Sequence, residues 1–462
     1  MKIKNLMTTI ILFWVGLAGF QPITLAEEPD KASSSQLIAG PVFQPFFDEI
    51  MSMNPELEAA RANWRSKAAL VEPAGYLPDP TLSLGLYLQE VETRVGPQQA
   101  RLGISQSLPW KGKLRLKSDM AAAGAQAARR NYENLRVHLF SDFKKWVFEL
   151  IYLNQAIHVT FGHVELLKEW EGLMAARYTT DMVGMSDWIR VQVEMDRLQD
   201  RLATLRAARE PVIAELNRIL NRPAGSAFKV TAGMQFQLPE RIPYSRKQLQ
   251  LAMRADNPEL QALDSRIYLK KSTISLARKN FFPDFKVGVD FIQTGSARMD
   301  GIDGSGKDPV VLKFGLILPL NRKKYRLLQT AASESFVAAT RKKVGRQNAL
   351  TSRLALLRFQ YEDAVRKMRL YREKLIPDTR DSLDVTVSAY EAGGDGFLDI
   401  IDTERTLLAL ELGLERANAD GLKALAVMEQ ITIRPLIVDT QKTRVVHEQP
   451  LDKDNISERK EN

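Results

Sequence analysis

The segment Gly301–Lys307 has the spacing of a phosphate-binding loop, GxxxxGK. Such a loop requires a Ser or Thr directly after its Lys to reach the metal of the bound nucleotide, and a helix must follow. Here Asp308 follows instead and places a negative charge where phosphate oxygens would lie, and the next segment alternates like a strand. The segment therefore predicts a glycine-rich loop between two strands and not nucleotide binding.

The sequence contains few residues that could bind a metal ion or act as a catalytic nucleophile. It has four histidines and no cysteine, which excludes disulfides, thiolate metal sites and a lipid-modified cysteine at a mature N-terminus. His158 and His163 are five residues apart and so lie on different faces of a helix, which disfavours a shared metal site. No nucleophile and base occur in a recognisable arrangement. We expect no metal, no cofactor and no enzyme activity.

The composition suits an exported chain that is neither disordered nor a bundle of membrane-spanning helices. The 462 residues are 45% hydrophobic and 26% charged, and the net charge of +9 is spread over interspersed basic and acidic residues, which disfavours nucleic-acid binding. Residues 1–26 read as a signal peptide, with Lys2 and Lys4 before the apolar run Met7–Phe20 and small residues at 24–26. The alternative is an uncleaved anchor, but this run is short for a span of roughly 20 residues.

Two similar halves follow one another along the chain. Asn54–Leu57 (Asn-Pro-Glu-Leu) recurs as Asn257–Leu260, and Leu77–Asp79 is answered by Phe282–Asp284. Further along, Leu108-Pro109 recurs as Leu318-Pro319. The residues Tyr178, Gly184 and Asp187 likewise recur, in the same order, as Tyr390, Gly396 and Asp399. Matches in one order at a spacing of about 200 residues indicate an internal duplication.

Four segments alternate strictly between apolar and polar residues, and they lie at 80–90, 99–108, 284–293 and 309–318. Period-two alternation predicts strands with one apolar and one polar face, and each is close to the length of a tilted membrane-spanning strand. The apolar positions that we expect to face lipid include Leu82, Leu84, Leu86, Leu312, Phe314 and Leu316. The alternative is a soluble sandwich with one wet face. The Gly, Ser, Arg and Lys of the polar face favour a water-filled lumen.

Most of the remaining sequence predicts long helices. No proline interrupts the chain from Trp110 to Tyr178, and apolar residues recur there at spacings of three and four. The same heptad pattern follows Trp188 and recurs from Leu357 to Leu375, which is typical of antiparallel coiled coils. Pro211 lies within a helical stretch, where the helix should kink or restart.

Four strands cannot close a membrane pore by themselves. In lipid every backbone amide must be paired, so a sheet must close, and bacterial barrels begin at eight strands. Identical neighbours must therefore complete the barrel, with eight strands in a dimer or twelve in a trimer. The helices would form a shared tube, because their apolar stripes would otherwise stay exposed to water.

Several motifs resemble those of the TolC-like outer-membrane efflux proteins over nearly all of the mature sequence. They are Asn54–Leu57, Leu77–Pro80, Ser105–Lys113 (Ser-Gln-Ser-Leu-Pro-Trp-Lys-Gly-Lys), Val183–Met185 and Phe397–Asp402. The resemblance implies a mainly α fold with a β-barrel portion. It implies long antiparallel helices that form a periplasmic α-barrel, and four strands per chain that complete a twelve-stranded barrel in a homotrimer. Many relatives carry a lipidated N-terminal cysteine, which this chain lacks, so we expect the barrel alone to hold it in the membrane.

The resemblance also implies the domain layout and the partners. Its ranges are the signal peptide 1–26, a first repeat 27–220 with a helical tip near 178–186, a linker 221–246, a second repeat 247–432 with a tip near 390–398, and a polar tail 433–462. The implied function is a passive exit duct for small molecules or metal ions in a tripartite efflux system of the outer membrane. Its implied partners are a periplasmic adaptor, an inner-membrane pump and outer-membrane lipid, with no nucleic acid.

Two sets of site residues are implied by matching motifs. The hairpin tips would meet the adaptor through Val183, Gly184, Met185, Tyr390, Gly394 and Gly396. Asp399 and Asp402 fall where the family has an acidic constriction ring, and Asp395 lies close enough to belong to it. Such a ring would attract cations. The alternative is that these carboxylates are ordinary charges on a solvated helix start.

Basic runs follow the second strand of each half, at Lys111–Lys117 and Arg322–Arg326. They could attract anionic lipid below the periplasmic headgroups, but a solvated helix start is the commoner meaning of such a run. Two other functions stay open beside the efflux duct: a duct for type I protein secretion, and a periplasmic coiled-coil scaffold with no pore.

Overall fold

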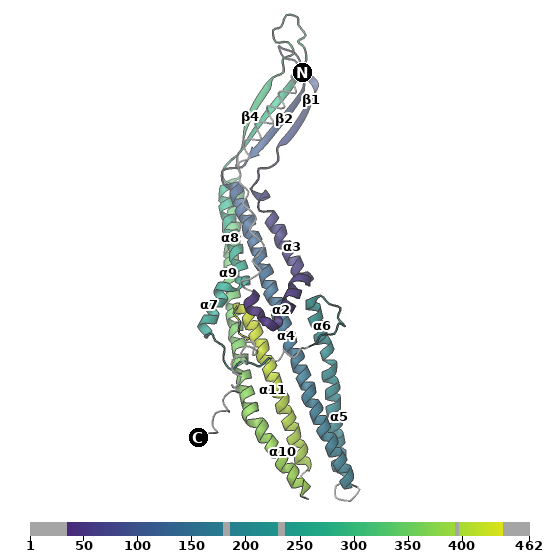
Figure 1. Ribbon diagram of the computed structural model, residues 1–462. Coiled ribbons are helices and arrows are strands. Elements are labelled where there is room, and N and C mark those ends of the chain that lie inside the picture. Colours follow the sequence, from purple (N-terminus) through teal and green to yellow (C-terminus); the bar gives the residue numbers. More distant parts are fainter. Residues whose placement is uncertain (1–34, 179–184, 230–235, 393–396, 438–462) are drawn as a thin grey trace, which may run out of the picture. The chain divides into compact units, whose positions relative to one another are not determined.

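The computed structural model describes residues 35–178, 185–229, 236–392 and 397–437 (Figure 1). The elements of the first half are α2 (Ser35–Met53), α3 (Pro55–Ala69), the short 3₁₀ helix η1 (Pro73–Gly75), β1 (Thr81–Val91), β2 (Gln98–Leu108), α4 (Lys113–Tyr178), α5 (Met185–Ala207) and α6 (Arg209–Leu220). Those of the second half are α7 (Arg246–Asp256), α8 (Pro258–Lys279), β3 (Asp284–Thr294), β4 (Val310–Ile317), α9 (Arg322–Leu370), η2 (Tyr371–Leu375), α10 (Ile376–Glu391) and α11 (Phe397–Thr432). The described chain is thus mostly helical with one small sheet.

The strands form a single antiparallel sheet in the order β1-β2-β3-β4. The central pair, β2 and β3, joins the two halves of the chain, with Gly103 opposite Asp290 and Ile104 opposite Val289. The chain leaves β2 into α4, enters β3 from α8 and leaves β4 into α9, so one end of the sheet adjoins the ends of these helices (Figure 1). The loop Gly301–Lys307 joins β3 to β4, as its sequence predicts, and Gly301, Gly304 and Gly306 adopt positive φ there.

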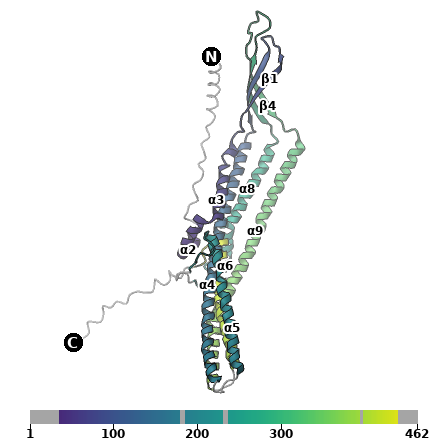
Figure 2. The same ribbon diagram turned by 90° about the vertical axis from the view of Figure 1, so that its right-hand side faces the viewer.

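α4 is a single helix of 66 residues, about 100 Å long at 1.5 Å per residue. It packs along α3, α5, α8 and α11, and Figure 2 shows the return of the chain through α5 beside it. The predicted restart near Pro211 is present: α5 ends at Ala207 and α6 begins at Arg209. Pro211 has no amide hydrogen to donate to the carbonyl four residues earlier, which accounts for the break.

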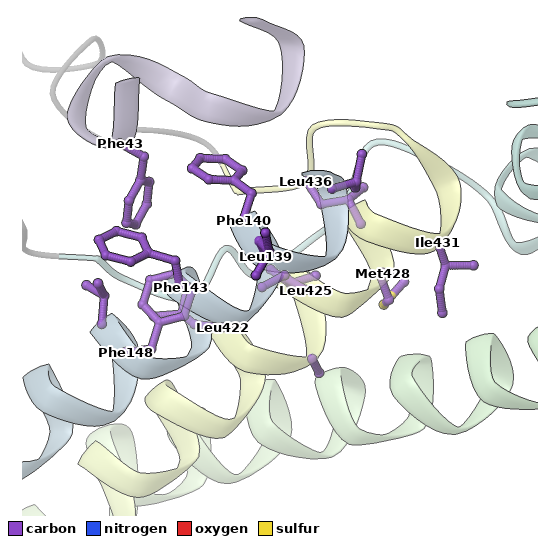
Figure 3. Close-up of a cluster of buried hydrophobic side chains, with 14 of the residues drawn as sticks. Phe43, Leu139, Phe140, Phe143, Phe148, Leu422, Leu425, Met428, Ile431 and Leu436 are labelled. Carbon is purple, nitrogen blue, oxygen red and sulfur yellow. The ribbon is translucent and has the colours of Figure 1, made fainter. Parts of the chain in front are cut away.

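A buried apolar cluster lies where α2, α4 and α11 meet (Figure 3). Phe43 of α2 stacks on Phe236 at 5.0 Å between centroids and meets Phe140 and Phe148 of α4 edge-on. Leu422 and Leu425 of α11 complete the cluster, which is also labelled in Figure 3. It fixes the helices that carry the sheet to those that carry the hairpin tips.

One ion pair is buried beside this cluster. Lys144 Nζ lies 2.7 Å from Glu429 Oε2, and both side chains are almost fully buried. The other oxygen of Glu429 accepts hydrogen bonds from the backbone N–H groups of Leu436 (2.7 Å) and Ile437 (2.9 Å). Residues 433–437 fall in the range expected to begin a polar tail, yet Leu436 is fully buried here. The carboxylate draws that first stretch into the core.

A second buried cluster holds the two helical hairpins together. It contains Met174 of α4, Val191 and Leu198 of α5, Leu383 of α10 and Ile400 of α11. Val191 and Leu198 lie seven residues apart on α5, the spacing that the heptad pattern indicates. On α9 the predicted stripe is buried at Leu357, Tyr361, Ala364 and Met368, and then a π-turn begins at Tyr371.

The π-turn η2 lies directly before Pro377, which cannot donate a helical hydrogen bond. It sets the Tyr371 ring over Gly413 of α11, where a β-carbon would lie only 3.0 Å from the ring. Glycine at 413 therefore lets the two helices approach at this point. Among the described residues, no helix is both long enough and apolar enough to be a membrane span.

Candidate functional site

The apolar face of the sheet unites all the predicted lipid-facing residues. The register places Leu82, Ile104, Val289 and Leu312 in one row across the four strands. Since residues directly opposite one another project to the same side, this row forms a continuous apolar band. The predicted side chains are 57–77% exposed, and they are Leu82, Leu84, Leu86, Leu312, Phe314 and Leu316. A contiguous exposed apolar surface of this kind marks contact with lipid or with another protein.

The opposite face of the sheet is polar and carries an ion-pair cluster that the sequence did not reveal. Asp290 of β3 is almost fully buried between two cations, with Lys313 Nζ 2.7 Å from its Oδ1 and Arg101 paired with its other oxygen. Gly103 lies opposite Asp290 in the register, and a β-carbon there would collide with the carboxylate. Lys286 belongs to the same face, four residues before Asp290 on β3. The sheet thus has one apolar and one charged surface, which suits a wall between lipid and water.

The hairpin tips are described only in part. Val183, Gly184, Gly394 and Gly396 lie outside the described residues. Met185 begins α5 and is 50% exposed. Tyr390, near the end of α10, is half-buried, and its hydroxyl donates to Met174 Sδ at 3.3 Å. Its ring packs on Phe397 of α11, so Tyr390 ties three helices together as well as lying near a tip.

The predicted acidic residues begin α11. Asp395 lies outside the described residues, whereas Asp399 and Asp402 lie in the first two turns and are exposed. Their spacing of three puts them on one side of the helix, opposite the buried Ile400 and Ile401. Asp402 Oδ1 is 3.3 Å from Arg405 Nη1, so its charge is partly balanced within the helix. The helix dipole also stabilises the Asp399 carboxylate, as it does any acidic residue in the first turn of a helix.

Arg405 also connects α11 to α5. Its Nη2 lies 2.7 Å from Glu194 Oε2, and Arg197 approaches the same oxygen at 2.9 Å. The Glu194 side chain is 4% exposed, so it is a buried carboxylate held between two guanidinium groups. The hydrogen bonds to Glu194 raise the pKa of Arg405, despite some desolvation. This arrangement fixes the start of α11 against the neighbouring hairpin.

His163 lies at the centre of a second buried network, between α4 and α11. Its Nδ1 contacts Glu404, and its Nε2 lies 3.0 Å from Glu411 Oε2. Arg380 of α10 pairs with the other oxygen of Glu411. Burial alone would lower the pKa of His163, but the two carboxylates raise it to about 9. A charged histidine therefore bridges two glutamates, and the seven-residue spacing of Glu404 and Glu411 was the only hint of it in the sequence.

These clusters do not form a metal centre. Among the residues that the structure describes, no group of three or more His, Asp or Glu side chains is placed to hold a metal ion. The carboxylates that converge do so on arginine, lysine or histidine, which satisfies their charge.

Known proteins match this chain in sequence and in fold. Residues 250–432 match the family model described as outer membrane efflux protein. Nodulation protein T from Rhizobium leguminosarum bv. trifolii is 20% identical over 403 residues, 84% of either chain. The pyoverdine export outer membrane protein OpmQ from Pseudomonas putida is 21% identical over 79% of this chain and 80% of its own length.

Solved structures of low sequence identity share the fold. A membrane protein from Pseudomonas aeruginosa has a TM-score of 0.74 at 15% identity, covering 89% of this chain and 98% of its own. The outer membrane protein VceC from Vibrio cholerae has a TM-score of 0.69 at 16% identity, over 85% of this chain and 96% of its own. The MtrE outer membrane channel from Neisseria gonorrhoeae gives 0.70 at 19%, over 91% and 97%.

The predicted resemblance is confirmed. The chain is similar to the TolC-like outer membrane efflux proteins in sequence over residues 250–432 and in fold over most of its length. The family match and the shared fold group the chain with outer-membrane proteins that have a large helical periplasmic portion, the location that the sequence also predicts. The two-faced sheet is then the part of the chain suited to lipid, and the helical hairpins are the part suited to the periplasm.

Proposed function

We propose that three copies of this chain form a passive exit duct of a tripartite efflux system. The open sheet carries the proposal. β1 and β4 are its two edges, and an exposed edge at membrane depth must be paired by another chain. Three four-stranded sheets would make a twelve-stranded barrel, the number implied by the family resemblance. The apolar band would face lipid, and the surface with Arg101, Lys286 and Lys313 would face the lumen.

The helices support the same assembly. α9 leaves large apolar side chains exposed along its length, and these are Leu327, Leu328, Val337, Val344, Leu356 and Phe359. A helix that is apolar beyond its own core contacts favours burial against a further element. Neighbouring copies would cover this surface and close the helices into a periplasmic tube.

Equivalent contacts in the two halves support an internal duplication. Asn54 caps α3 and its amide donates to the carbonyl of Ile219 at 2.8 Å, while Asn257 caps α8 and donates to Ile431 at 3.0 Å. Each half then ends on a residue with positive φ, Asn221 in the first and Ile433 in the second. The same tether thus recurs at the same place in each half.

The periplasmic end carries the proposed gate and docking surface. Asp399 and Asp402, with Asp395, would line a narrow acidic ring in the trimer. The tips around Met185 and Tyr390, with Val183, Gly184, Gly394 and Gly396, would meet a periplasmic adaptor that links the duct to an inner-membrane pump. That pump would supply the energy. Small molecules or metal ions are the proposed cargo, and the name of the OpmQ relative, a pyoverdine export protein, favours small solutes over proteins.

Two measurements on one preparation test this function. The detergent-extracted protein should have the mass of a trimer, and after reconstitution into planar bilayers it should conduct ions in discrete steps. A trimer that conducts supports the shared barrel. A monomer that does not enter membranes would overturn it and favour a scaffold without a pore.

A further inference from the structure

A collar of basic residues surrounds the junction between the sheet and the helices. It comprises exposed cations that all lie within nine residues of a strand end, and these are Lys111, Arg115, Lys117, Arg278, Arg322, Lys323, Lys324 and Arg326. The acidic residues near these strand ends are Glu72, Asp79, Asp119 and Asp284. Asp284 is engaged by Lys113 Nζ at 2.8 Å and by the backbone N–H of Trp110 at 2.7 Å. The junction collar therefore carries a marked excess of positive charge.

Local helix electrostatics do not account for this charge. α4 and α9 both begin at the junction, and neither has an acidic residue in its first turn. Each begins with basic residues instead, Lys113 and Arg115 in α4 and Arg322–Lys324 in α9. The start of a helix is its positive end, so these cations are unfavourable to the helices that carry them. An external anion would remove that cost. Arg278 differs, because it lies at the end of α8, where a cation is favoured.

Aromatic rings lie among the cations. Trp110 stacks on Phe282 at 5.0 Å and on Phe285 at 5.8 Å between centroids. Arg322 lies over the Phe281 ring and Lys324 over the Tyr325 ring, at 6.0 and 5.7 Å. Aromatic side chains beside Lys and Arg are typical of the boundary between the apolar core and the headgroups of a membrane.

The collar continues directly from the apolar band. Leu316 ends the band on β4 at 57% exposure, Leu318 and Leu320 follow at 55% and 80%, and Arg322 begins the basic run. The surface thus changes from apolar to cationic over one short stretch. A phospholipid leaflet presents the complementary order of acyl chains and then phosphate.

We propose that the junction collar binds the phosphate groups of anionic phospholipids in the periplasmic leaflet of the outer membrane. The proposal rests on the outer-membrane location of the protein and on the apolar band facing lipid. It does not depend on the cargo or on the acidic ring. Each basic residue near an anionic membrane surface adds to the attraction between protein and lipid. Several cations together therefore give the collar a preference for anionic over zwitterionic lipid.

Binding of phosphatidylglycerol to the detergent-extracted protein tests the collar, with phosphatidylcholine as the zwitterionic comparison and native mass spectrometry as the readout. The wild type should retain phosphatidylglycerol over phosphatidylcholine. The triple variant Arg322→Gln/Lys323→Gln/Arg326→Gln should bind phosphatidylglycerol at least about tenfold more weakly. The matched control Arg341→Gln/Lys342→Gln/Arg353→Gln removes the same charge from exposed positions further along α9 and should bind as the wild type does.

A charge-retaining variant separates lipid binding from folding. Arg322→Lys/Arg326→Lys keeps the cations and should retain phosphatidylglycerol, and the same spectra report whether each variant keeps the wild-type oligomeric mass. Equal retention of both lipids by the wild type would overturn the proposal, as would unchanged binding by the triple variant. Displacement of the lipid by inorganic phosphate alone at millimolar concentration would show a general anion site and would also overturn it. Step conductance in bilayers tests the duct separately, because it does not report which lipid the collar binds.

Discussion

The side-chain amide of Asn257 donates to the backbone carbonyl of Ile431 at 3.0 Å, while its side-chain oxygen accepts from the N–H of Leu260. One asparagine thus caps the start of α8 and binds the end of α11, 174 residues away. Both groups are buried, so neither can exchange its partner for water. The Asn-Pro-Glu-Leu motif is therefore a structural tether.

Replacing this tether should destabilise the helical portion. Asn257→Ala removes the cap and leaves the Ile431 carbonyl buried without its donor, and we expect a loss of about 2 kcal/mol in the free energy of unfolding. Asn257→Asp keeps the acceptor for the cap but sets a buried carboxylate oxygen against the Ile431 carbonyl oxygen, so its loss should be at least as large. Thermal melting followed by circular dichroism compares the two. Equal melting of Asn257→Ala and wild type would show that the tether is dispensable.

Charge on the apolar band should prevent membrane assembly. Leu84→Lys would place a cation in lipid at a cost of roughly 2–4 kcal/mol if it lies near the bilayer midplane, and Leu316→Lys, at the end of the band beside the collar, should cost less. The amount of protein in the outer-membrane fraction measures the effect. Ser83→Lys is the matched control, since Ser83 is the neighbour of Leu84 on the polar face, and its membrane fraction should be unchanged. Mild effects at all three positions would contradict the lipid-facing assignment and favour a soluble hairpin.

The strands were accessible to sequence reasoning because their pattern is local. Leucine alternates with Thr, Ser and Gly along β1, and a helix would spread such a pattern around its whole surface and could not bury it on one face. The structure has β1 at Thr81–Val91, within a residue of the predicted range 80–90. The helices could be predicted from local patterns too, because heptads repeat along them and proline is scarce.

The charged networks were not accessible, because their members are far apart in the chain. His163 meets Glu404 across 241 residues, and nothing in the neighbourhood of either residue indicates the other. Arg101 reaches Asp290 as a diagonal neighbour only because β2 pairs with β3 in one particular register. The pairing of Asp402 with Arg405 was local, however, and an acidic residue three positions before an arginine on a helix is a recognisable ion pair. Because Asp402 has this partner, Asp399 and Asp402 should contribute unequally to an acidic ring.

Stability should fall at alkaline pH through His163. Its pKa is raised from 6.5 to about 9 by Glu404 and Glu411 in the folded protein. A raised pKa contributes stability that is complete below about pH 6.5 and is lost as pH rises through about 9. The shift corresponds to up to about 3 kcal/mol. Glu411 has a lowered pKa, so its own contribution is lost only in acid.

Melting temperatures between pH 6 and 10 measure this dependence. The wild type should lose stability over the upper half of the range, whereas His163→Gln, which cannot titrate, should be less stable at pH 6 and nearly flat. His138→Gln is the control, since His138 lies on the same helix but is half exposed beside Asp142. Parallel curves for wild type and His163→Gln would show that the histidine does not carry the effect.

The acidic residues of α11 should set the ion selectivity of the reconstituted pore, and unequally. Asp399→Ala should lower the preference for cations more than Asp402→Ala, because Arg405 already balances part of the Asp402 charge at 3.3 Å. Reversal potentials in planar bilayers under a salt gradient measure the preference, and the double variant should move furthest toward zero. Asp381→Ala/Asp384→Ala removes two exposed carboxylates from α10 and serves as the control. If the double variant of α11 kept the wild-type reversal potential, these carboxylates would be ordinary solvated charges at a helix start, and the constriction would have to lie elsewhere.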